Sequence, residues 1–266
     1  MVLLAVWAFV GAEPGRALEV DCRACDYCRT KGDLGAELTR RIRAHLDQGR
    51  SAEVIARIEG GTNLAAILRP PIALWANRHP EAVRPDPVRL KYRGLNLPNN
   101  RLFTSYEPCV KVCGVCLGTD KLAHVFQQGW EYYTISVLDQ KGDRLAERYG
   151  EWLEGLEPRQ RYADAEEYFK RQFSGRHLGY GAFGRTMSGV ISPADLEANK
   201  AGLRLYKDLA RGVFRSMDDY ISPQLCEEVN PNQYTPEVQA VVEKNQRQQA
   251  APGAACLCLK PDVSDI

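Results

Sequence analysis

The sequence has no strong excess of charge of either sign and no long hydrophobic run. Its 35 basic and 34 acidic residues leave a net charge of +1, and no basic block interleaved with aromatic residues occurs. A phosphate backbone needs such a surface, so we expect no nucleic-acid partner. Beyond the first residues, no segment is apolar enough to cross a bilayer as a helix, and there is no internal repeat. The 266 residues, 44% hydrophobic and 26% charged, have the composition of a globular protein with one sizeable core.

The chain begins with a short apolar run, MVLLAVWAFVGA, which ends at once at Glu13 and Pro14. The run is too short to span a bilayer and is typical of the core of a signal peptide. We therefore expect residues 1–17 to be a signal peptide, a mature chain that begins between Glu13 and Leu18, and a periplasmic or otherwise exported protein. A buried first helix is the alternative.

Nine cysteines are many for a chain kept in a reducing compartment. In an oxidising compartment they would form disulfides between loops, with one thiol left over and a pairing that spacing cannot reveal. The alternative is metal binding, because a C-x3-C-x2-C spacing also holds iron–sulfur clusters in radical enzymes that use S-adenosylmethionine, and thiolates also bind zinc. The three groups are Cys22, Cys25, Cys28; Cys109, Cys113, Cys116; and Cys226, Cys256, Cys258.

Hydrophobic periodicity predicts an all-α, mainly helical fold. Leucine or isoleucine recurs every four positions from Leu34 to Leu46, which predicts a helix over 33–48. A short helix should run from Ser51 to Ile58, and another should open at Asn63 before Pro70 interrupts it. Further helices are expected from Thr119 as the capping residue, over 145–156, over 164–173, and from Ser192.

The remaining segments predict how these helices are connected. Residues 80–109 are proline-rich and lack periodicity, so we expect an extended connector that wraps the body. A glycine-rich loop around His177 resembles a binding loop or lid. Beyond Pro223 the chain looks partly disordered. The domain prediction is a single helical domain over 18–230 and a partly disordered, cysteine-containing tail over 231–266.

Two of the expected helices each carry one polar stripe. The spacing of four and seven residues puts the members of a stripe on one face of a helix. If the two stripes face each other, they form a site. The first stripe consists of Asp120, His124 and Glu131, and the second of Asp195, Asn199, Gly202 and Tyr206.

This combination suits acid–base chemistry. A neutral His124 oriented by Asp195 or Asp120 would act as general base, while Asn199 donates a hydrogen bond to developing charge. Lys121 would neutralise an anionic group of the substrate. We expect Lys121, Glu131, Gly202 and His177 to bind substrate, and no cofactor to be required.

Alternatives stay open at the same residues. His124 with Glu131 or Asp195 could bind a divalent cation, although the gap from His124 to Glu131 is wider than adjacent ligands on a helix use. Asp195 follows Ser192 by three positions and could belong to a capping box. Asn199 and Gly202 are poor helix formers, which indicates close packing or a polar contact. A buried hydrogen-bond network without catalysis is therefore the second hypothesis.

The ordered pair DKLAH and DLEANKAG resembles the D-K-x-x-H and D-x-x-x-N-x-x-G pair of the VanZ-like proteins and a related group of small periplasmic bacterial proteins. The resemblance covers two short segments and implies a shared site in the cell envelope, made of Asp120, Lys121, His124, Asp195, Asn199 and Gly202. Unlike VanZ-like proteins, this chain lacks transmembrane helices. We expect an exported envelope protein, either a hydrolase or transferase acting on a phosphorylated or lipid-linked envelope molecule, or a binding or scaffold protein at an envelope component or membrane surface.

Overall fold

The computed structural model describes residues 28–61, 70–85, 90–95, 108–172, 181, 184–186 and 188–249. Several predictions from the sequence fall outside these residues: the signal peptide over 1–17, the helix from Asn63, His177, and the cysteines Cys22, Cys25, Cys256 and Cys258. They stay predictions.

Helices make up most of the described chain, as the periodicity predicts. The helices near the start of the described chain bury apolar residues in the core, where Leu38, Ile42 and Ile55 are fully buried. Pro71 begins a helix, because the first turn of a helix tolerates a missing N–H. The helices before residue 100 are α1 (Gly35–Asp47), α2 (Ala52–Ile55), the π-helical turn η4 (Ala56–Gly60) and α4 (Pro71–Arg78), after the 3₁₀ turn η3 (Cys28–Thr30).

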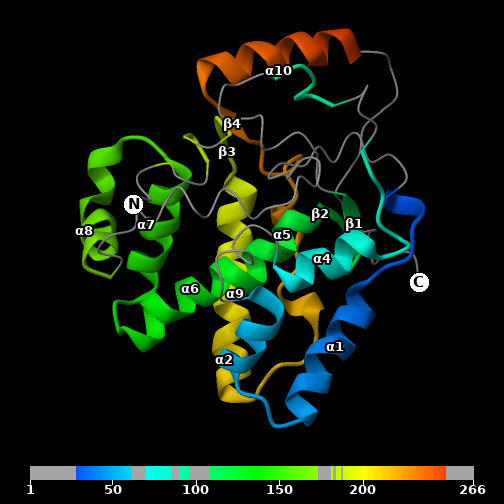
Figure 1. Cartoon of the computed structure of the whole chain (residues 1–266), viewed down its shortest axis with the longest axis vertical. Helices are drawn as coiled ribbons and strands as arrows, with labels where there is room; N and C mark the ends of the chain where they lie inside the picture. Colours follow the sequence, from blue (N-terminus) through cyan, green and yellow to red (C-terminus); the bar gives the residue numbers. More distant parts are fainter. Residues whose placement is uncertain are drawn as a thin grey trace, which may run out of the picture.

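Two helices that cross at the centre of the molecule carry the two motifs (Figure 1). One is α9 (Pro193–Arg211). The other is continuous from Thr119 to Leu138 and consists of α5 (Thr119–Ala123), η7 (His124–Gln128), α6 (Gly129–Tyr133) and η8 (Thr134–Leu138), where η7 and η8 are π-helical.

Glycines let these two helices approach closely. A Cβ on Gly202 would overlap the carbonyl oxygen of Val125 and lie 2.6 Å from the Cα of Gly129. Tyr206, one turn further along α9, donates a hydrogen bond of 2.6 Å to the Phe126 carbonyl oxygen in η7. The expectation of close packing at Gly202 is confirmed, and the reason is backbone-to-backbone contact.

Helices α7 (Asp143–Glu154) and α8 (Ala163–Gln172) lie to the left of α9 in Figure 1. The 3₁₀ turn η9 (Arg159–Tyr162) precedes α8. Aromatic rings join α7 to α8, since Trp152 and Phe169 have ring centroids 5.1 Å apart. Two further 3₁₀ turns, η10 (Met217–Asp219) and η11 (Pro223–Leu225), follow α9.

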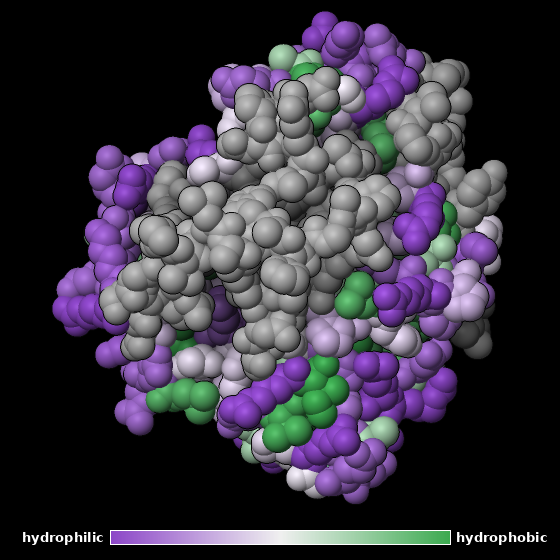
Figure 2. Space-filling model, in the orientation of Figure 1, coloured by the Kyte–Doolittle hydropathy of each residue, from purple (hydrophilic) through white to green (hydrophobic). Residues whose placement is uncertain are grey.

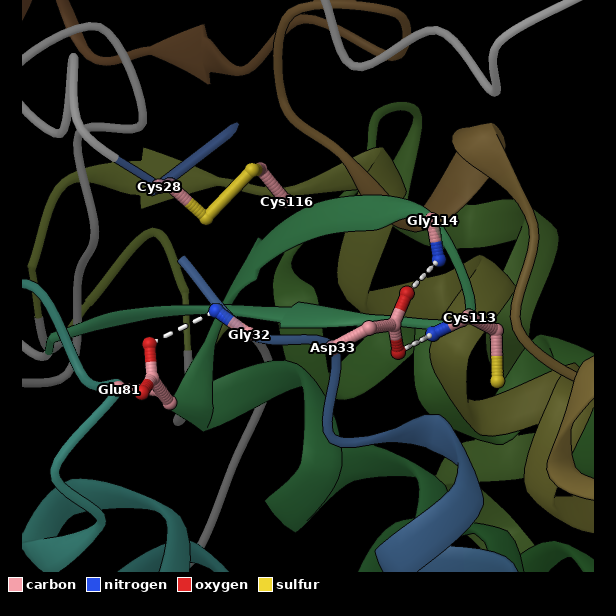
Figure 3. The surroundings of a disulfide bond; sticks show 7 residues. All are labelled: Cys28, Gly32, Asp33, Glu81, Cys113, Gly114 and Cys116. Carbon is pink, nitrogen blue, oxygen red and sulfur yellow. Dashed lines mark hydrogen bonds between the residues drawn. A yellow bond between two sulfur atoms is a disulfide. The ribbon is translucent and has the colours of Figure 1, made fainter. Parts of the chain in front are cut away.

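The middle cysteine group lies in a β-hairpin, which the sequence analysis did not predict. Strands β1 (Cys109–Val112) and β2 (Val115–Gly118) pair antiparallel, and both turn residues, Cys113 and Gly114, have positive φ. Asp33 fixes the turn by accepting hydrogen bonds from the Cys113 and Gly114 backbone N–H groups (Figure 3).

A disulfide between Cys28 and Cys116 joins the first cysteine group to this hairpin, with Cα atoms 6.0 Å apart. The thiol of Cys113 is buried and points away from that bridge (Figure 3). Cys109 and Cys226 are also disulfide-bonded. Disulfide bonding is thus present, but the bridge from Cys28 to Cys116 joins the turn η3 to strand β2 rather than two loops.

Residues after Pro223 are ordered further than expected. Strand β4 (Gln233–Tyr234) pairs with β3 (Val190–Ile191), and α10 (Pro236–Gln249) follows. The prediction of partial disorder is wrong for 223–249, because Val238 and Val242 of α10 are buried in a small core with Tyr92 and Val190. Tyr92 belongs to the expected connector, of which 91–94 form a turn and Val83 pairs with Cys109.

The surface of the described residues is mostly hydrophilic in the view of Figure 2, with a small hydrophobic area near its lower edge. Leu138 and Val213 are the most exposed large hydrophobic residues, each 53% exposed. Within the described ranges, no helix has both the length and the apolarity needed to cross a membrane.

Candidate functional site

The two motifs meet where the helices cross, as the matched spacings predict. His124 Nδ1 lies 2.9 Å from Asn199 Oδ1, and His124 Nε2 lies 3.2 Å from Asp195 Oδ2. The side chain of His124 is 19% exposed and that of Asp195 only 10%. Both ring nitrogens of His124, which lies in η7, therefore contact side chains on one face of α9.

Lys121 lies at the centre of the cluster, and its side chain is only 1% exposed. Its ammonium is 2.6 Å from Asp120 Oδ2, 2.5 Å from Asp195 Oδ1 and 3.2 Å from Glu227 Oε1. Three carboxylates thus surround one buried cation. Lys121 is thus paired with carboxylates of the protein itself, and the substrate-binding role expected for it from the sequence stays a prediction.

Three residues of the cluster were missed by the sequence analysis. Glu227 lies beyond η11, and its Oε2 accepts a hydrogen bond of 2.9 Å from Lys91. Glu154 is the last residue of α7 and is 3% exposed. Of these three residues, only Glu154 could have been noticed in the sequence. A carboxylate at the C-terminal, negative end of a helix is unfavourable, which indicates a specific role. Lys91 and Glu227 reach the site through tertiary contacts alone.

The π-helical turn decides which residue continues the first stripe. In a regular α-helix Glu131 would follow Asp120 on the same face, but η7 takes one extra residue into its turn. Tyr132 therefore occupies this place, and Asn199 Nδ2 lies 3.4 Å from the Tyr132 hydroxyl. Glu131 is half-buried on α6, seven residues further along the helix than His124.

Asp195 takes part both in the N-terminal cap of α9, through its backbone, and in the site, through its carboxylate. Ser192 caps α9 with its side chain, which accepts a hydrogen bond of 3.3 Å from the Asp195 N–H. In a capping box the Asp195 carboxylate would accept the Ser192 N–H in return. Here Glu154 Oε2 lies 3.5 Å from that N–H, and the Asp195 carboxylate is left for Lys121 and His124. Thr119, by contrast, does not cap its helix but donates to Asn77.

His124 is a cation in this environment. Both of its nitrogens face oxygen atoms, so both carry a proton. Burial alone would lower the pKa of His124, but the Asp195 carboxylate outweighs burial and the pKa rises to about 9. This charge state differs from the neutral ring that a general base needs.

The carboxyl groups have pKa values that are spread apart. Burial, together with Asp195 and Glu227, raises the pKa of Asp120 to about 6 despite the nearby Lys121. Burial and Asp195 also raise the pKa of Glu154 to about 8, so Glu154 is mostly protonated at neutral pH. For Asp195, His124 and Lys121 outweigh burial and hold the pKa well below its usual range.

At neutral pH the charges of the cluster balance. The cations are Lys91, Lys121 and His124, and the anions are Asp120, Asp195 and Glu227. Two carboxylate oxygens of the cluster, Asp120 Oδ1 and Asp195 Oδ1, are buried and have no hydrogen-bond partner among the described residues. Asp195 Oδ1 lies 2.5 Å from the Lys121 ammonium, whereas no such ion-pair contact is made by Asp120 Oδ1 within the described part of the chain. A buried carboxylate oxygen without a donor is uncommon and marks where a ligand or water donor fits.

No metal centre is formed by the residues that the structure describes, in which His, Cys, Asp and Glu side chains nowhere group as three or more ligands. The cysteine spacing that indicated an iron–sulfur cluster does not supply three thiolates, since Cys109 and Cys116 are both disulfide-bonded. Gly202 packs against backbone, so it belongs to the helix crossing rather than to a substrate contact.

Comparisons of the chain with protein-family models, with curated proteins and with solved structures found no match. The function is therefore argued from the geometry of the cluster.

Proposed function

We propose that the protein is an enzyme, a hydrolase or transferase, that acts on a phosphorylated or lipid-linked molecule of the cell envelope after export. The observation that carries the proposal is the buried, unpartnered oxygen of Asp120 one helical turn from the cationic, partly exposed ring of His124. A base and an acid are thus held side by side on one helix.

The cost of the cluster supports a role beyond folding. Each ion removed from water costs several kcal/mol, and well-packed hydrophobic residues often serve stability equally well. Here seven ionisable groups from separate segments converge, and several of their pKa values are strongly shifted. Shifted pKa values gather preferentially at functional sites.

The pKa values assign the two roles. Asp120, with a pKa of about 6, would be the base, and His124, with a pKa of about 9, would be the acid. Water or a hydroxyl group would lose a proton to Asp120 as its oxygen bonds to phosphorus. The leaving oxygen would take the Nε2 proton of His124 as its own bond to phosphorus breaks. Asn199 would hold the ring by Nδ1.

A pH profile of phosphate release tests these roles. The probes are p-nitrophenyl phosphate and a short polyprenyl pyrophosphate in detergent. The rate should rise through about pH 6 and fall through about pH 9, since the base must be ionised and the acid protonated. Asp120→Asn and His124→Gln should each lower the rate by roughly 100-fold or more. The matched control is Glu197→Gln, which changes a half-buried carboxylate of α9 that pairs with Lys200. No release from either probe, or release unaffected by both variants, would contradict the proposal.

A second candidate is a non-catalytic binding or scaffold protein. It is favoured by the charge balance and by the partners that both His124 nitrogens already have. His124→Gln should lower stability on either hypothesis, because Asp195 loses an ion-pair partner. The effect of a ligand on the melting temperature distinguishes the enzyme hypothesis from the scaffold hypothesis. An enzyme site should be stabilised by inorganic pyrophosphate, seen as a higher melting temperature that Asp120→Asn or His124→Gln removes, whereas a structural network should show no shift.

A further inference from the structure

The charged cluster continues from Lys121 to the C-terminal part of the chain. Glu227 bridges two lysines, with Oε1 3.2 Å from Lys121 Nζ and Oε2 2.9 Å from Lys91 Nζ. The side chains of Lys91 and Glu227 are 8% and 2% exposed. Lys91 is therefore the outermost cation of a buried row of charges that ends at Asp120 and Asp195.

The turn that carries Lys91 is held by α10. Asn245, which is 3% exposed, donates from its Nδ2 to the carbonyl oxygens of Lys91 at 2.9 Å and of Arg93 at 2.7 Å. Just before β4, Asn232 donates to the Tyr92 hydroxyl at 3.0 Å. The backbone of the turn is thus fixed on both sides of Tyr92.

We propose that Lys91 is a positioning residue of the site and that Asn245 of α10 holds it there, so that the C-terminal helix controls the charge around Asp120. Lys91 touches neither reacting group and acts through Glu227. Lys91 neutralises Glu227, which leaves the ammonium of Lys121 to Asp120 and Asp195. This inference deepens the proposed function, on which its catalytic consequence rests, but its electrostatic consequence holds without any reaction.

Loss of Lys91 should change the protonation of Asp120. The charged groups that act on Asp120 are Lys121 on its own helix, Asp195 on α9, and Glu227. His124 and Glu154 interact with Asp195 in turn. With Lys91 neutral, the Glu227 carboxylate is left to Lys121 alone, and the surroundings of Asp120 become more negative. A more negative environment raises the pKa of a carboxyl group.

Carbon-13 NMR of the full chain labelled at aspartate carboxyls measures this pKa, with the Asp120 signal assigned from its absence in Asp120→Asn. Lys91→Met should raise the pKa of Asp120 by roughly one unit, and Asn245→Ala should shift it in the same direction by less. Lys91→Arg keeps the charge and should restore the original value. Gln239→Ala, a change on α10 at a side chain that bonds Glu243 of the same helix, should leave it unchanged.

Unchanged Asp120 titration in both Lys91→Met and Asn245→Ala would overturn the inference, and if Lys91→Met does not fold, Asn245→Ala decides alone. A shift that Lys91→Arg fails to reverse would also count against it, since shape rather than charge would then be responsible. The acid limb of the rate profile should move with the Asp120 pKa. If the pKa moves and a measurable rate profile does not, the positioning role stands and the assignment of Asp120 as the base fails.

Discussion

Lys121 Nζ lies 2.5 Å from Asp195 Oδ1, and this ion pair joins the two motifs inside the protein, where the lysine side chain is 1% exposed. Since Asp120 and Glu227 contact the same ammonium, a single cation holds three carboxylates together. The stability of the two-helix crossing therefore depends on the charge of Lys121.

Removing the charge of Lys121 should destabilise the fold strongly. Lys121→Met leaves three buried carboxylates without their shared cation, and breaking a buried ion pair costs about 3 to 5 kcal/mol. Urea unfolding at pH 7 measures the free energy of unfolding. Lys200→Met, whose partner Glu197 lies on the surface, should cost less than about 0.5 kcal/mol. Equal effects of the two substitutions would show that the buried cluster is not formed.

Stability should fall as the pH rises from about 4 to about 9. The pKa values of Asp120, Glu154 and His124 are all raised in the folded protein, to about 6, about 8 and about 9. The folded state therefore binds more protons than the unfolded state in this range, and each proton released costs stability. The contribution of His124 is complete below its unfolded pKa of 6.5 and is lost as the pH rises through about 9.

Melting temperatures between pH 5 and pH 9.5 measure this loss. For His124 the shift corresponds to about 3 kcal/mol. His124→Gln should be less stable than the unsubstituted protein at pH 6, and the two should converge by pH 9.5. Parallel curves for the two proteins would rule out a raised pKa at His124.

A side chain at Gly202 should separate the two central helices. In Gly202→Ala the new Cβ would overlap the Val125 carbonyl oxygen and lie against Gly129, so the backbones must move apart. We expect a loss of several kcal/mol by denaturant unfolding, within the range of overpacked sites. Gly212→Ala is the matched control at the end of α9, with open space but a φ of +69°, and should cost about 1 kcal/mol.

The disulfide between Cys28 and Cys116 should stabilise the fold by restricting the unfolded chain. It spans a sequence separation of 88 residues, for which chain entropy gives about 4 to 5 kcal/mol as an upper value. Cys28→Ser should lose a large part of this amount, and reduction should have no further effect at that bridge. Cys113→Ser, at a thiol outside the bridge, should have a much smaller effect. Peptide mapping of the denatured, alkylated and unreduced protein checks the pairing, since a peptide that contains Cys28 should be recovered linked to one that contains Cys116.

Local patterns were enough to predict several elements. The periodicity from Leu34 to Leu46 predicts α1, and Ser192 marks the start of α9, because helix periodicity and capping depend on neighbours in the sequence. The hairpin of β1 and β2 was missed because its two short strands lie within a cysteine pattern that also suits metal binding. Helix α10 was missed because its buried residues are few and find their partners in residues 90–95.

Local spacing along the chain is enough to place Asp120 with His124 on one helix face and Asp195 with Asn199 on another, since helical periodicity depends only on neighbours in the sequence. The groups that surround these four residues follow from contacts between distant segments. The π-helical turn η7, stabilised by contacts with α9, brings Tyr132 rather than Glu131 to Asn199. Lys91, Glu154 and Glu227 arrive from distant segments, and the Asp195 carboxylate, brought to His124 by the helix crossing, makes His124 a cation despite its burial. Charge state depends on desolvation and on neighbouring ions, and both are set by packing across the chain.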